Sequence, residues 1–117
     1  MGPFIDNDAF FEKELSRGVR LRIVSGDKLM LSEVTLEPGA VVPLHSHPHE
    51  QAGRCLSGEF ELEVGGEARR IRAGDTYLIP GGVPHSARGL EERCVTLDIF
   101  SPPREDYLPE PRHRGRG

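Results

Sequence analysis

Turn-forming residues recur every several positions along the chain, and this spacing limits the folds available to it. They form groups at Ser25-Gly26-Asp27, Glu37-Pro38-Gly39, Ser57-Gly58, Gly65-Gly66, Ala73-Gly74-Asp75, Pro80-Gly81-Gly82 and Arg88-Gly89. In the clearest stretch between them, Phe60, Leu62 and Val64 alternate with glutamates before the two-glycine turn. A period of two followed by such a turn predicts a β-hairpin. Many short strands in 117 residues predict one all-β domain, a sandwich or a barrel.

Only residues Asp8 to Leu15 could form a helix, so one short N-terminal helix at most is expected. We divide the chain into an N-terminal extension (residues 1–19), a β-barrel (20–107) and a flexible tail (108–117). The tail is basic, with Arg112, His113, Arg114 and Arg116. Such a terminus is usually solvated, and we expect both His113 and His49 to be exposed and to have no role.

Composition and charge exclude several classes of protein. The 15 basic and 19 acidic residues give a net charge of −4, which produces no field that would recruit nucleic acid. No apolar run approaches the roughly 20 residues that span a bilayer, so no membrane insertion is expected. Met1 to Phe11 carries acids and no basic stretch of a secretory signal, so a cytoplasmic location is expected. Two cysteines, Cys55 and Cys94, suit a reducing compartment, although a disulfide between them stays open.

Two stretches, Lys28 to Leu36 and Cys94 to Phe100, carry apolar residues on both faces. A strand in a small barrel has only one inward face, so a second apolar face needs a cover. A second copy of the chain is the simplest cover, and we therefore predict a homodimer.

Three histidines lie in a pattern that suits a metal site. His45 and His47 are two residues apart, so on an extended strand both rings leave from the same face. His85 follows a Gly- and Pro-rich stretch that indicates a strand, a tight turn and a second strand. Two imidazoles on one face near a third suit a borderline divalent ion, although a single such histidine more often has only a packing role.

Both segments resemble the two-part signature of the cupin superfamily. The first part is represented by Gly39, His45, His47, Gln51 and Gly58, and the second by Gly74, Pro80, Gly82 and His85. The Asn that usually ends the signature is absent, and Gly89 stands there. Because that Asn is not a ligand, the departure concerns a turn rather than the metal. The resemblance covers about Arg20 to Tyr107 and implies a single jelly-roll β-barrel.

The same resemblance implies one divalent transition metal ion held by His45, His47, Gln51 and His85. Three imidazoles and an amide suit Ni, Fe, Mn, Zn or Co alike. Most metal-binding cupins have a Glu where Gln51 stands. A neutral ligand set favours Lewis-acid chemistry on an anionic substrate and disfavours the higher oxidation state that oxygen chemistry uses. The alternative, that Gln51 is no ligand, stays open.

Near the C-terminus, Asp98 and Phe100 share one face of a predicted strand. If that face is interior, the carboxylate points toward the metal cavity, where it has either structural partners or a catalytic task. Arg104 could grip a substrate carboxylate or form a salt bridge with Glu105 or Asp106.

Residues 45–51, 57–62 and 98–108 are similar to the pectin-degradation cupins that linearise unsaturated uronates. This resemblance implies catalytic roles for Asp98, Phe100 and Arg104 and a carboxylated sugar as substrate. The implied reaction is metal-dependent ring opening of 4,5-unsaturated monouronates to 5-keto-4-deoxyuronates. Two alternatives stay open: a cupin dioxygenase with redox-active iron, and a cupin that binds a small acid without turning it over.

Overall fold

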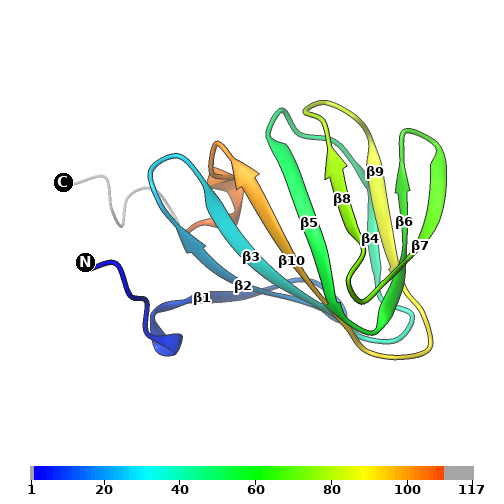
Figure 1. Ribbon diagram of the computed structural model, residues 1–117, viewed down its shortest axis with the longest axis horizontal. Helices are drawn as coiled ribbons and strands as arrows, with labels where there is room; N and C mark the ends of the chain where they lie inside the picture. Colours follow the sequence, from blue (N-terminus) through cyan, green and yellow to red (C-terminus); the bar gives the residue numbers. More distant parts are fainter. Residues whose placement is uncertain (1, 110–117) are drawn as a thin grey trace.

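The computed structural model describes residues 2–109, and within them ten strands form two antiparallel sheets that face each other (Figure 1). The six-stranded sheet has the order β1-β2-β3-β10-β5-β8. Its strands are β1 (Phe11–Ser16), β2 (Val19–Ser25), β3 (Met30–Leu36), β10 (Cys94–Ser101), β5 (Glu50–Ser57) and β8 (Thr76–Ile79). The four-stranded sheet has the order β4-β9-β6-β7, with β4 (Val41–His45), β9 (His85–Gly89), β6 (Glu59–Val64) and β7 (Glu67–Arg72).

This arrangement confirms the predicted all-β jelly roll, and the hairpin at Gly65-Gly66 joins β6 to β7 as expected. The barrel is not closed by a continuous backbone ladder. At the seam between β1 and β4, the Ser16 hydroxyl donates to the carbonyl of Val41 over 3.1 Å. The described helices are two three-residue 3₁₀ turns, η1 (Asn7–Ala9) and η2 (Glu105–Tyr107), and neither is long enough to cross a membrane.

The expectation of a short N-terminal helix over Asp8 to Leu15 is wrong. Phe11–Ser16 is strand β1, which pairs with β2 so that Phe11 lies opposite Ile23 and Lys13 opposite Leu21. Phe11, Lys13 and Leu15 alternate with exposed glutamates, which places one face of the strand against the core. The free edge of β2 supplies backbone partners, and this tertiary pairing overrides the helical composition. The six-stranded sheet therefore begins within residues 1–19, while residues 110–117 and His113 lie outside the described residues.

β10 lies in the middle of the larger sheet and shows the predicted separation of its two faces. Its inner residues Cys94, Thr96, Asp98 and Phe100 are buried, whereas Val95 and Leu97 are half-buried and Ile99 is exposed on the outer face. The interior changes character along the barrel. At one end, buried apolar residues such as Val19 and Leu36 fill the space, and at the other end the inner face carries Gln51, Asp98 and Phe100.

Cys55 and Cys94 are both buried and free within the apolar part of the core, and burial raises the pKa of Cys55. Burial raises the pKa of Cys94 to about 12. Both thiols are therefore protonated at neutral pH and act as small core side chains.

Candidate metal centre

The three histidines gather at the polar end of the barrel, although they come from two separate segments. His45 is the last residue of β4 and lies opposite His85, the first residue of β9. His47 follows just beyond the end of β4, where the chain is no longer a strand. One ring nitrogen from each histidine lies within 4.8 Å of the other two, a group that could hold a metal ion.

Each of the three rings is fixed by a backbone carbonyl two residues away. Nδ1 lies 2.8 Å from the oxygen of Pro43 for His45, 3.1 Å from that of His49 for His47, and 2.9 Å from that of Val83 for His85. A carbonyl oxygen can only accept, so each Nδ1 carries the proton. This tautomer leaves Nε2 of each ring with a free lone pair, as metal-binding histidines require.

Burial keeps two of these rings neutral. Burial, the positive charge of Arg104 and the neighbouring His85 lower the pKa of His47 to about 4. Burial also lowers the pKa of His85. At neutral pH both imidazoles therefore have a lone pair available to a cation.

Gln51, the second residue of β5, adds an oxygen to the group. Its Oε1 lies 3.2 Å from Nε2 of His47, and Gln51 lines the same cavity as Asp98. Because the proton of His47 is on Nδ1, its Nε2 is an acceptor, and the Oε1 of Gln51 faces it. Two acceptor atoms then face each other, and Nε2 of His85 is buried without a hydrogen-bond partner among the described residues. A divalent cation would satisfy all of these atoms, so the residues fit a metal site of nitrogen and oxygen ligands.

The second glycine motif holds the loop that carries His47. The backbone N–H of Gly82 donates to the carbonyl of His47 over 2.8 Å. Gly81 packs so closely on the carbonyl of Pro48 that a Cβ at this position would overlap it. The two sequence motifs are therefore parts of one packed structure, and the glycines serve close backbone approach.

His49 was expected to be exposed, and this expectation is wrong. Its side chain is buried, and its Nε2 lies 3.0 Å from Oε1 of Glu105. The contact ties the C-terminal turn to the loop of His47.

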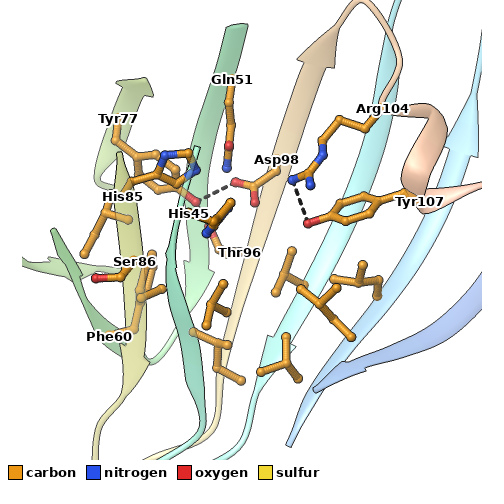
Figure 2. Close-up of a pocket in the computed structure, with 18 residues that line it drawn as sticks. His45, Gln51, Phe60, Tyr77, His85, Ser86, Thr96, Asp98, Arg104 and Tyr107 are labelled. Atoms are coloured by element: carbon orange, nitrogen blue, oxygen red, sulfur yellow. Dashed lines mark hydrogen bonds between the residues drawn. The ribbon is translucent and has the colours of Figure 1, made fainter. Parts of the chain in front are cut away.

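Asp98 projects from β10 into the interior, as its position in the alternating pattern predicted. Burial raises its pKa to about 6, while the hydrogen bond from Tyr77, the nearby amide of Gln51 and the charge of Arg104 oppose this shift. The Tyr77 hydroxyl donates to Oδ1 of Asp98 over 2.6 Å (Figure 2). A buried carboxyl with this pKa is close to half ionised just below neutrality, which suits a group that takes up and returns a proton.

Phe100 and Arg104 lie beside the histidines. The Phe100 ring contacts His47 edge-on, with ring centroids 5.7 Å apart. Arg104 is only 7% exposed, donates to the Tyr107 hydroxyl over 2.9 Å and pairs with Asp106 over 2.8 Å. Its guanidinium also lines the cavity that contains Asp98 (Figure 2). Two roles were expected for Arg104, a salt bridge with a nearby acid and the binding of a substrate carboxylate. The salt bridge is present, and the same side chain also faces the cavity.

A cleft of about 350 Å³ between β1 and β4 opens onto this group. Its lining includes Lys13, Leu44, His45, Arg104 and Tyr107. The cleft joins an apolar wall to two cationic side chains and a proposed metal ligand, an arrangement that suits a small anionic molecule.

Three residues at the site were missed by reasoning from the sequence: Tyr77, Tyr107 and Thr96. Tyr77 had an available signal, because Gly53 stands inside a strand, and a strand glycine often marks the close approach of another group. Nothing local marked Tyr107 or Thr96, since their partners lie on other elements.

The comparisons with known proteins agree with this geometry. Residues 32–100 match the cupin domain family, and the chain belongs to that family. It is 36% identical over 107 residues to the pectin degradation protein KdgF of Dickeya dadantii, covering 90% of this chain and 96% of that protein.

Two solved structures share the fold along nearly their whole length. KdgF from Halomonas sp. superimposes with a TM-score of 0.83 at 34% identity, covering 92% of this chain and 100% of that chain. An RmlC-like cupin from Shewanella frigidimarina also has a TM-score of 0.83, at 27% identity, with 92% and 97% coverage. Within the cupin family, this chain is therefore similar over about nine-tenths of its length to a protein of pectin degradation.

Proposed function

We propose that this protein is a metal-dependent enzyme that linearises 4,5-unsaturated monouronates to 5-keto-4-deoxyuronates, in pectin or alginate breakdown. The observation that carries the proposal is the cavity that Asp98 shares with His45, Gln51 and His85, which places a buried carboxyl beside the three-histidine group. The relationship to a pectin degradation protein over 90% of the chain supports a sugar acid as the substrate.

We assign His45, His47, Gln51 and His85 as the ligands of one divalent transition metal ion. The support is the tautomer that the Nδ1 contacts impose, together with the lone pairs that face one another at His47 and Gln51. Bound there, such an ion would act as a Lewis acid that stabilises negative charge on substrate oxygens.

Asp98 moves the proton in the proposed reaction. The substrate is a cyclic hemiacetal whose ring oxygen joins carbon 1 to carbon 5 of a 4,5 double bond. Asp98 takes the proton of the anomeric hydroxyl, carbon 1 becomes an aldehyde, and the bond from carbon 1 to the ring oxygen breaks. The electron pair of that bond stays on the oxygen as an enolate at carbon 5. Protonation of carbon 4 by Asp98 then gives the 5-keto product, so the reaction is an isomerisation with no proton gained or lost.

Arg104 and Phe100 bind the substrate in this proposal. Arg104 lies at the end of the cleft with its charge shared with Asp106, and it binds the uronate carboxylate. Phe100 is held against His47 and packs on the sugar ring. The cleft between β1 and β4 gives the substrate its path to Arg104.

The test is NMR of metal-loaded protein mixed with a 4,5-unsaturated monouronate. Loss of the vinylic proton on carbon 4 well above the spontaneous rate, abolished in His47→Ala, is the expected result. No acceleration with Ni, Fe, Mn, Zn or Co would overturn the proposal. Oxygen uptake by the iron form without loss of the vinylic signal would instead indicate a dioxygenase.

We also propose that the protein is a cytoplasmic homodimer. The outer face of the larger sheet carries a continuous apolar row across five strands, in the order Val24, Leu31, Ile99, Ala52 and Leu78. Leu78 is 62% exposed and Ile99 38% exposed, so this row lacks a cover within the described chain. A second copy would bury it. Sedimentation showing only a 13.0 kDa species at micromolar concentration would contradict the dimer. The free, buried cysteines agree with a reducing compartment.

A further inference from the structure

Tyr77 reaches Asp98 from two strands away. In the larger sheet, Asp98 of β10 lies opposite Gly53 of β5, and Gly53 lies opposite Tyr77 of β8. All three positions belong to the same cross-strand row. Neighbouring strands are about 4.8 Å apart, so the Tyr77 side chain has to cross β5 to reach the carboxylate. Figure 2 shows its hydroxyl directed at Asp98.

Gly53 makes this crossing possible. A Cβ at position 53 would overlap Cε1, Cζ and the hydroxyl oxygen of Tyr77, so the ring lies where another residue would have a side chain. A glycine inside a strand weakens the strand, because it has no side chain to pack and loses more entropy on folding. At position 53 this destabilisation is offset, because the absence of a side chain leaves space for the Tyr77 ring.

The hydrogen bonds around Tyr77 have a defined direction. Its hydroxyl lies 2.6 Å from Oδ1 of Asp98 and 2.7 Å from Oγ1 of Thr96. Burial and the Asp98 charge raise the pKa of Tyr77 far above its ordinary value, so the hydroxyl keeps its proton. An ionised Asp98 only accepts, so Tyr77 donates to Asp98 and Thr96 donates to Tyr77. Gln51, on the neighbouring strand β5, lines the same cavity as Asp98.

We propose that Tyr77 is a positioning residue for the reaction: by holding Oδ1 of Asp98, it sets the direction in which the carboxylate meets the substrate. The inference rests on the proposed function, in which Asp98 moves the proton. Thr96 contributes to the same positioning, because its hydroxyl donates to Tyr77 and the Tyr77 proton is then directed to Asp98. The chain of contacts from Thr96 through Tyr77 to Asp98 links the core of the barrel to the cavity that the candidate metal ligands line.

The experiment compares the metal-loaded wild type with Tyr77→Phe, which keeps the ring over Gly53 and removes only the hydroxyl. We expect kcat per bound metal to fall about tenfold to a hundredfold, the effect of losing a hydrogen bond to a charged group. KM and the bound metal per chain, measured by elemental analysis, stay within about twofold of wild type. In an Asp98→Asn background, Tyr77→Phe lowers kcat by no more than about a further twofold. Tyr107→Phe is the matched control, since its hydroxyl contacts Arg104, and its effect is expected on KM.

A Tyr77→Phe protein with wild-type kcat per bound metal would overturn the inference. An equal fold-loss of kcat when Tyr77→Phe is added to the Asp98→Asn variant would also overturn it, because a purely structural role does not depend on Asp98. If Tyr77→Phe does not fold, Thr96→Val decides: a kcat about threefold or more below wild type supports the inference, and an unchanged kcat overturns it. A wild type that does not consume the uronate overturns the proposed function and this inference together, whereas an active wild type with an equally active Tyr77→Phe overturns the inference alone.

Discussion

His45 and His85 lie directly opposite each other in the ladder between β4 and β9, with ring centroids 4.3 Å apart. The register of this ladder shifts between Val42 and His45, so a bulge in β4 brings His45 level with the first residue of β9. Bulges often redirect a side chain next to a functional site. In this protein the bulge joins two histidines that are forty positions apart in the chain.

The first prediction concerns metal binding. His47→Ala is expected to lower the affinity for the metal at least about a hundredfold, because loss of even an indirect contact to a metal site lowers affinity by up to that much. Isothermal titration with Ni²⁺ or Zn²⁺ measures the change. His49→Gln is the matched control, since the His49 ring nitrogen contacts Glu105 instead of the histidine group. Equal metal affinity in His47→Ala and wild type would remove His47 from the ligand set.

The second prediction concerns the proton. Asp98→Asn keeps the shape of the side chain and removes the base, so kcat is expected to fall about 10²- to 10⁴-fold with metal retained. The vinylic NMR assay measures the rate. Asp27→Asn, on the exposed turn before β3, is the control and should leave turnover unchanged. Full activity in Asp98→Asn would show that another group moves the proton.

The third prediction concerns substrate binding. Arg104→Ala is expected to raise KM about tenfold or more, because a charge-assisted hydrogen bond to the uronate is lost. Since Arg104 also contacts Asp106 and Tyr107, thermal melting should be recorded for the same variant. Arg93→Ala is the comparison, because Arg93 forms an exposed pair with Glu37. If both variants keep the wild-type KM, Arg104 does not bind the carboxylate.

The fourth prediction concerns the fold. Gly53→Ala is expected to destabilise the protein by about 1–3 kcal/mol, the usual cost of adding volume to a packed core. The added methyl group would overlap the Tyr77 ring. Urea unfolding measures the change in free energy. In a Tyr77→Leu background the same substitution should cost clearly less, and an equal cost in both backgrounds would argue against the Gly53–Tyr77 contact.

Local patterns in the sequence were sufficient for much of the fold and part of the site. Alternation along Phe60 to Val64 and the glycine turn after it predicted a hairpin because strand geometry and turn geometry depend on neighbouring residues. The same alternation placed Asp98 and Phe100 on one face of β10, and that face is buried. The spacing of His45, His47 and His85 indicated the histidine group that the structure brings together.

Only the tertiary structure decided which residues meet across the barrel. Residues 11–16 form a strand because the edge of β2 lies beside them, and their own composition did not indicate it. His49 contacts Glu105, far along the chain, and Arg104 pairs with Asp106 and donates to the Tyr107 hydroxyl. Tyr77 reaches Asp98 only because the registers of β5, β8 and β10 place Gly53 between them. Register depends on packing between strands distant in sequence, so the sequence determined the parts of this site, and the fold determined their contacts.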